Sequence, residues 1–142
     1  MPVDTAERER RRALLAAHYE SENEHDLDGI MRTFSTSGEM IYNGQAFGDD
    51  ESIRLGHTYI GFSSAPGAFS DVHVTRDREH VTDDEIVVEG RLRGVHRAEF
   101  QGFAPTNRTV ELPFIAFYRF GSDGKLVSER VVMNLGPLAQ QP

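Results

Sequence analysis

The apolar residues of this chain change their spacing once, near residue 68, and this change limits the fold more than any other feature. Before it, apolar residues recur every three or four positions, which is typical of helices with one buried face. After it, apolar and polar residues alternate, which is typical of strands in a half-buried sheet. A block of helices followed by a block of strands predicts an α+β domain.

Three helices are predicted in the first block. The first begins at a cap supplied by Asp4 or Thr5 and ends near Asn23. The second, shorter helix follows Asp26 and extends to Phe34, and the third begins in the segment 48–51. A short strand and a strong turn signal separate the second helix from the third. They are Glu39–Tyr42 and Asn43-Gly44.

Four strands are predicted in the second block, and their short connections favour an antiparallel meander. A curved sheet with the helices on its concave face would bury the apolar side of each helix and leave a cavity at one end. The predicted strands are Phe69–Arg78, Glu85–His96, Thr109–Phe120 and Lys125–Asn134.

Alternation along a strand assigns side chains to faces. In the strand 85–96 the apolar face ends in His96, which therefore points toward the expected cavity. In the strand 109–120 the inward row includes Phe114, and Ile115 belongs to the outer row. In the last strand Arg130 and Asn134 share one face, and hydrophobicity does not decide whether that face is the inner one.

The loop between the two long strands carries a family resemblance. It reads Gly94-Val95-His96 and then Phe100-Gln101-Gly102-Phe103-Ala104-Pro105-Thr106-Asn107-Arg108. The chain resembles the SnoaL-like polyketide cyclases, within the superfamily of ketosteroid isomerase and nuclear transport factor 2. The resemblance covers most of the chain. It implies one domain over 1–142, with an ordered core of about 5–135, in which a cone-shaped curved antiparallel sheet and three N-terminal helices enclose a pocket.

The resemblance also implies a chemistry. Cyclases of this family close a ring by an intramolecular aldol reaction and use side-chain acid–base groups without metal or organic cofactor. His96 matches the family's histidine and is the predicted catalytic residue. Positions where relatives often carry acids hold Asn43, Ala116 and Asn134 here. The sequence therefore leaves two alternatives open: a cofactor-independent cyclase, isomerase or dehydratase, and a non-catalytic small-molecule binding or dimeric interaction domain.

Further residues are candidates for contacts with a small, mostly apolar, oxygenated ligand. Tyrosine, histidine and asparagine can hydrogen-bond ligand oxygens, and aromatic rings suit a flat ligand. Arg130 is an anion clamp if it points inward and a surface cation if it points outward. The predicted binding residues are Tyr19, Tyr42, Asn43, His57, Phe114, Arg130 and Asn134. The six histidines show no tight ligand spacing such as His-x-x-x-His, so no metal is expected.

Composition narrows the partners. The formal net charge of −8 argues against nucleic acid and against an anionic membrane, because phosphate binding needs clustered Lys and Arg. No apolar run has the length of a signal sequence or a membrane span, and a cytoplasmic protein is the simplest expectation. A homodimer is expected through the outer sheet face, where Ile115 and Phe117 need cover.

Overall fold

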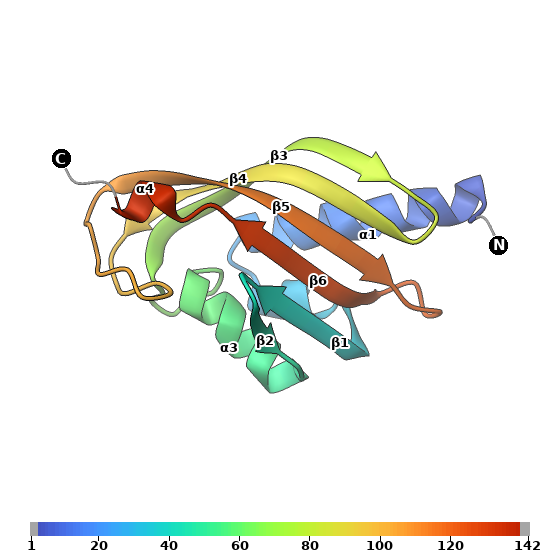
Figure 1. Cartoon of the computed structure of the whole chain (residues 1–142). Coiled ribbons are helices and arrows are strands. Elements are labelled where there is room, and N and C mark those ends of the chain that lie inside the picture. The colour runs from blue at the N-terminus through green and yellow to red at the C-terminus, as the bar shows by residue number, and fades with distance from the viewer. Residues whose placement is uncertain (1–2, 140–142) are drawn as a thin grey trace.

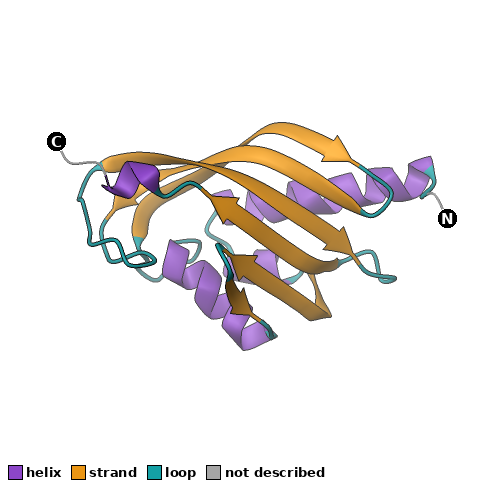
Figure 2. Ribbon diagram, viewed as in Figure 1, coloured by secondary structure: helices purple, strands orange, loops and turns teal. Residues whose placement is uncertain are grey.

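The computed structural model describes residues 3–139, and its centre is a curved sheet with α1 and α3 on the inner side (Figures 1 and 2). The elements are α1 Thr5–Asn23, α2 Leu27–Met31, β1 Phe34–Tyr42, β2 Gln45–Phe47, α3 Asp50–Ile60, β3 Phe69–Val81, β4 Glu85–His96, β5 Thr109–Phe120, β6 Leu126–Met133 and α4 Gly136–Ala139. The predicted α+β class and the three N-terminal helices are confirmed.

The six strands lie in the order β2-β1-β6-β5-β4-β3. Strands β3 to β6 form the predicted antiparallel meander. Strand β1 instead runs parallel to β6, with Ile41 opposite Arg130. This pairing joins the helical half of the chain to its last strand, and it brings α1, α3 and β6 around a common interior.

Local chemistry explains where the helices begin. The side chains of Asp4, Asp26 and Asp49 each accept a hydrogen bond from a backbone N–H in the first turn of the helix that follows. Asn43 and Gly44 both have positive φ and make the turn between β1 and β2.

Some predicted boundaries differ from the structure. The second helix ends at Met31, and Phe34 begins β1 because it pairs with Leu126 of β6. A long-range pairing thus overrides a helical pattern. Neither β2 nor α4 was predicted, and α4 lies just after the expected ordered core of about 5–135. Residues 140–142 lie outside the described residues.

The inward rows of the sheet form the core. Ile86, Val88, Leu92 and His96 of β4 are buried, as are Val110, Leu112, Phe114, Ala116 and Tyr118 of β5. In β6 the buried row is Glu129, Val131 and Met133, so Arg130 and Asn134 point outward and are exposed. Hydrophobicity did not decide which face of the last strand points inward. The structure shows that the inner face is the one with Glu129, Val131 and Met133, and it includes a buried carboxylate.

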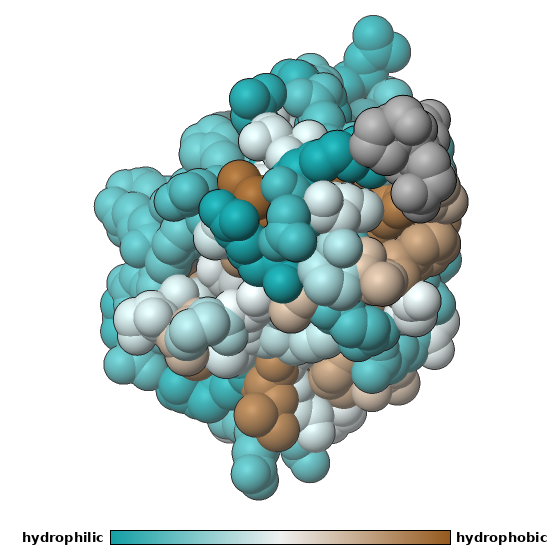
Figure 3. All heavy atoms as spheres, turned by 90° about the vertical axis from the view of Figure 1, so that its left-hand side faces the viewer, coloured by the Kyte–Doolittle hydropathy of each residue, from teal (hydrophilic) through white to brown (hydrophobic). Residues whose placement is uncertain are grey.

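Outside the core the surface is mixed. At the end that holds α4 and the 97–108 loop it is mostly hydrophilic, with separate apolar spots (Figure 3). On the outer face of the sheet, Ile115 and Val132 are 44% and 52% exposed. Within residues 3–139, no helix is long and apolar enough to cross a membrane.

Candidate functional site

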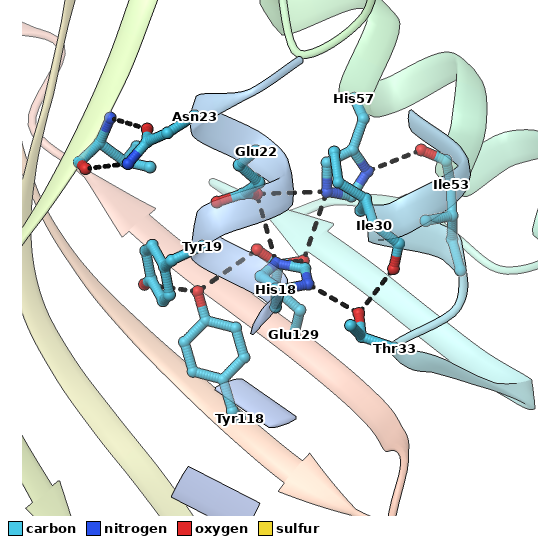
Figure 4. Close-up of polar contacts among 11 residues, drawn as sticks. His18, Tyr19, Glu22, Asn23, Ile30, Thr33, Ile53, His57, Tyr118 and Glu129 are labelled. Carbon is cyan, nitrogen blue, oxygen red and sulfur yellow. Dashed lines mark hydrogen bonds and ion pairs between the residues drawn. The ribbon is translucent and has the colours of Figure 1, made fainter. Parts of the chain in front are cut away.

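Two histidines and two glutamates meet inside the curved sheet, and we call His18, Glu22, His57 and Glu129 the interior quartet (Figure 4). His18 and Glu22 are one turn apart on the buried face of α1, His57 comes from α3 and Glu129 from β6. No member is more than 3% exposed. Four ionisable side chains rarely share one buried space unless they are paired or bind an ion.

Close packing of α3 brings His57 into the quartet. The preceding residue, Gly56, lies against β1, and a Cβ atom there would come within 2.5 Å of the Met40 side chain. Glycine therefore allows the helix to approach the strand. The result is that His57 is 1% exposed although it belongs to the last turn of a surface helix.

The distances within the quartet are uniform. His18 Nε2 lies 3.3 Å from Glu22 Oε2 and 3.5 Å from Glu129 Oε1. His57 Nε2 lies 3.5 Å and 3.6 Å from the same two oxygens. The Nε2 atom of each histidine thus faces both carboxylates at nearly equal distances.

The opposite ring nitrogens are held by neutral groups outside the quartet. His18 Nδ1 lies 2.9 Å from Thr33 Oγ1, and the Thr33 hydroxyl donates to the Ile30 carbonyl. Because that hydroxyl proton is already used, Nδ1 of His18 must be the donor. His57 Nδ1 donates in the same way to the Ile53 carbonyl, at 2.9 Å. Both rings therefore turn Nε2 toward the carboxylates.

Charge within the quartet outweighs burial. Burial by itself lowers the pKa of His18, but the neighbouring carboxylates of Glu22 and Glu129 raise that pKa to about 10. Burial likewise raises the pKa of Glu22, while His18 and His57 lower it to about 2. His18 consequently favours its positive form and Glu22 its negative form.

A pair of tyrosines extends the polar interior. The hydroxyls of Tyr19 and Tyr118 are 2.6 Å apart, and the Tyr118 hydroxyl lies 3.5 Å from Glu129 Oε2. Burial raises the pKa of both phenols, so they are neutral hydrogen-bond donors near pH 7. The hydroxyls can therefore donate toward a carboxylate or toward an oxygen that takes its place.

A small cavity adjoins the tyrosines and the two glutamates. Its volume is about 10 Å³ for the centre of a water-sized sphere, which is room for about one water. Its lining is Tyr19, Glu22, Tyr42, Phe62, Val74, Phe114, Tyr118, Glu129 and Val131. A surface groove of about 610 Å³ between α1 and β3 reaches the other side of Tyr19 and Val74. These two side chains separate the groove from the cavity.

The predicted site residues fall into two groups. His57 is a member of the interior quartet, and Tyr19, Tyr42 and Phe114 line its cavity. His96 lies elsewhere in the interior: its ring stacks on Phe69 at 5.3 Å, and its Nδ1 accepts from the Thr106 N–H at 3.2 Å. Burial lowers the pKa of His96. This histidine orders the start and end of the 97–108 loop.

The remaining three predicted residues lie away from the cavity. Asn43 bonds the backbone of Met133 through both its amide oxygen and its amide nitrogen, and so ties the end of β1 to β6. The Arg130 guanidinium lies 4.2 Å from the centre of the Phe117 ring on the outer face. Asn134 is exposed and accepts from the Gly136 N–H.

Sequence reasoning missed His18, Glu22 and Glu129 as functional candidates. Two signals were present. His18 and Glu22 interrupt the apolar stripe of α1 at a spacing of four, and Glu129 stands in a row with Val131 and Met133. A polar residue in an otherwise apolar row is the informative exception.

Comparison with known proteins agrees with this fold. The sequence model of the SnoaL-like polyketide cyclases matches residues 12–142. The chain belongs to that family. No curated protein matches the chain in sequence. The family is consistent with binding of small molecules or with cyclase activity.

Solved structures show the same fold at low identity. A protein assigned as a SnoaL-like polyketide cyclase, from Jannaschia sp. CCS1, has a TM-score of 0.77 and 20% identity, covering 94% of each chain. TsrD from Streptomyces laurentii has a TM-score of 0.78 and 18% identity, covering 98% of this chain and 96% of its own. SalBIII, an epoxide hydrolase/cyclase-like enzyme with a role in pyran ring formation in salinomycin, has a TM-score of 0.74 and 15% identity, covering 91% and 94%.

Proposed function

We propose that the protein catalyses an acid–base reaction of the cyclase, isomerase or dehydratase type on a small oxygenated compound at the interior cavity. One observation carries the proposal: two carboxylates and two tyrosine hydroxyls converge on a cavity within the apolar core of a SnoaL-like chain. Tyr118 would donate to the substrate oxygen on which negative charge develops. Glu129, beside it, would take the proton from the neighbouring carbon.

A substrate would enter the cavity from the groove between α1 and β3. Tyr19 and Val74 lie between the groove and the cavity, and the Arg76 guanidinium covers the Tyr19 ring at 5.2 Å. The cavity has room for about one water, so a substrate needs the Tyr19 side chain to turn outward. The groove, with about 610 Å³, is large enough for a small organic molecule.

Exchange of α-protons tests this function without knowledge of the natural substrate. Aldol ring closure and double-bond isomerisation both begin by removing a proton next to a carbonyl. We expect the protein to accelerate deuterium exchange at the α-carbons of 2-tetralone in D₂O, followed by proton NMR. Tyr118→Phe should slow the exchange by about a hundredfold, as loss of one oxyanion donor does. His80→Gln, an exposed histidine paired with Glu89, should exchange like the wild type.

Two results of this experiment would contradict the proposal. Exchange at the buffer rate with wild-type protein, for 2-tetralone and for an open-chain β-diketone, rules out catalysis at the cavity for such ketones. Equal rates in the wild type and in Tyr118→Phe remove Tyr118 from the chemistry.

A second candidate is a dimeric binding protein without chemistry. The observation that favours it is an open groove of about 580 Å³ on the outer sheet face, where Ile115 and Val132 are exposed. A second copy of the chain would cover these apolar side chains. A dimer in sedimentation, together with no α-proton exchange, would support this candidate, and a monomer at all concentrations would contradict it.

A further inference from the structure

Three polar atoms of the interior quartet point at one another without making hydrogen bonds. His18 Nε2, His57 Nε2 and Glu129 Oε1 have no hydrogen-bond partner among residues 3–139. Their side chains are at least 97% buried, so water does not compensate them from outside. Buried polar atoms that lack partners are costly, and several aimed at one point indicate a missing binding partner at that point.

The nitrogen–oxygen distances in the quartet suit a bound metal ion better than direct hydrogen bonds. A charged N–H that donates to a carboxylate lies about 2.7 to 2.9 Å from its oxygen. The four nitrogen–oxygen distances here are 3.3, 3.5, 3.5 and 3.6 Å. For metal–ligand bonds of about 2.0 to 2.2 Å, a tetrahedral arrangement separates the ligand atoms by about 3.3 to 3.6 Å. All four distances fall in that range, and the four atoms lie within 4.8 Å of one another.

The second contacts of the ligands match those of metal-binding histidines. A histidine that binds a metal through one ring nitrogen donates the proton of the other to a backbone carbonyl or a comparable acceptor. His57 Nδ1 donates to the Ile53 carbonyl, and His18 Nδ1 donates to Thr33 Oγ1. These two bonds hold both rings so that their Nε2 atoms are directed into the quartet (Figure 4).

We propose that the interior quartet binds one divalent transition-metal ion, of which Zn²⁺ is the best match, in four-coordinate geometry. Two carboxylates carry two negative charges, which one such ion neutralises once both imidazoles are in their neutral form, so binding would release the extra proton of His18. Imidazole is a ligand of zinc and of its transition-metal neighbours, whereas Ca²⁺ and Mg²⁺ prefer six or more oxygens. The site is closed by four protein ligands and has room beside it for about one water.

This inference goes beyond the proposed function and does not depend on it. The resemblance to SnoaL-like cyclases implies chemistry without metal, and the histidine spacing gave no reason to expect one. The ligands instead come from three elements that are distant in sequence. Glu129 belongs to both sites, with Oε1 facing the histidines and Oε2 facing Tyr118. An ion would therefore sit next to the cavity.

Metal binding can be measured without any activity. We would remove metal from the full chain with a chelator and titrate it with Zn²⁺ by calorimetry. Co²⁺ in a second titration reports the geometry, because four-coordinate Co²⁺ absorbs strongly in the visible. We expect one equivalent of each ion and the four-coordinate Co²⁺ spectrum. His57→Gln and Glu129→Gln should each weaken Zn²⁺ binding at least about a hundredfold, and His80→Gln, at an exposed His–Glu pair, should bind like the wild type.

Each outcome decides the inference. No binding of Zn²⁺ or Co²⁺ by the wild type overturns it, as does equal binding by Glu129→Gln or a six-coordinate Co²⁺ spectrum. If a variant fails to fold, the wild type and His80→Gln still decide, because Zn²⁺ must raise the thermal midpoint of both. No rise overturns the inference. Proton exchange without metal binding contradicts only this inference, and metal binding without exchange contradicts only the proposed function.

Discussion

His18 and His96 both have no solvent-exposed surface, yet their surroundings differ. His18 faces two carboxylates, which raise its pKa to about 10. His96 stacks on Phe69 and accepts from a backbone N–H, and burial lowers its pKa. Two histidines that both lack exposed surface thus favour opposite charge states. Neighbouring carboxylates let His18 hold charge in spite of its burial, and among residues 3–139 His96 has no such neighbours in contact.

Removal of a quartet carboxylate should have the largest effect. Glu22→Ala in the metal-free protein leaves the charge of His18 only partly compensated in a buried site, and breaking such a pair costs about 3 to 5 kcal/mol. Urea unfolding at pH 7 measures the loss in free energy of unfolding. The double change His18→Leu with Glu22→Leu should cost less than the sum of the single changes His18→Leu and Glu22→Leu, because it removes both charges. A loss below about 1 kcal/mol for Glu22→Ala would contradict the pairing.

The pH dependence of stability should have opposite signs at the two histidines. His18 has a raised pKa, so its stabilisation of the metal-free protein is fully present below pH 6.5 and is lost as pH rises toward about 10. His96 has a lowered pKa, so the unfolded chain takes its proton first and stability falls as pH drops below 6.5. Thermal midpoints of the wild type, His18→Gln and His96→Gln across pH 5 to 9 separate the two. Parallel trends in both variants would sink the contrast.

Removal of the hydrogen bond from His18 to Thr33 should have a smaller effect, on the affinity for Zn²⁺. Thr33→Val keeps the shape but removes the acceptor for His18 Nδ1, which frees the ring to turn. Loss of such an outer contact typically weakens metal binding about 10- to 100-fold. Calorimetry with Zn²⁺ measures it, and Thr33→Ser should restore binding because it keeps the hydroxyl. Unchanged affinity in Thr33→Val would mean that the outer hydrogen bond does not orient the ligand.

The smallest effect on the folded chain is expected far from both histidines. Val132→Lys changes an exposed side chain on the outer sheet face, so the free energy of unfolding should move by less than about 0.5 kcal/mol. A dimer through that face would nevertheless dissociate, because the new charge would be buried at the contact. Sedimentation velocity of wild type and variant tests this expectation. A wild-type dimer that survives the change must use another surface.

Prediction from sequence succeeded where the physics is local. The cap at Asp4 (one of the two predicted candidates), the turn at Asn43-Gly44 and the strands Glu85–His96 and Thr109–Phe120 follow from neighbours within a few residues. The inward rows of β4 and β5 also followed from simple alternation.

The interior quartet could not be predicted in the same way. It requires β1 to run parallel to β6 and α3 to pack against β1, and both are contacts between segments far apart in the chain. A search for close histidine spacing fails because His18 and His57 lie on different helices. The buried Glu22 and Glu129, each in an apolar row, were the signals that local reasoning could have followed.

Anomalous diffraction tests the central claim, that the interior quartet is a binding site for a metal ion, most directly. Crystals of the full chain grown with Zn²⁺ would be measured on both sides of the zinc absorption edge. The account predicts one interior anomalous peak, about 2.0 to 2.2 Å from Nε2 of His18 and of His57 and from one oxygen each of Glu22 and Glu129. No peak at that point, with the histidines and carboxylates joined by short hydrogen bonds, would contradict it.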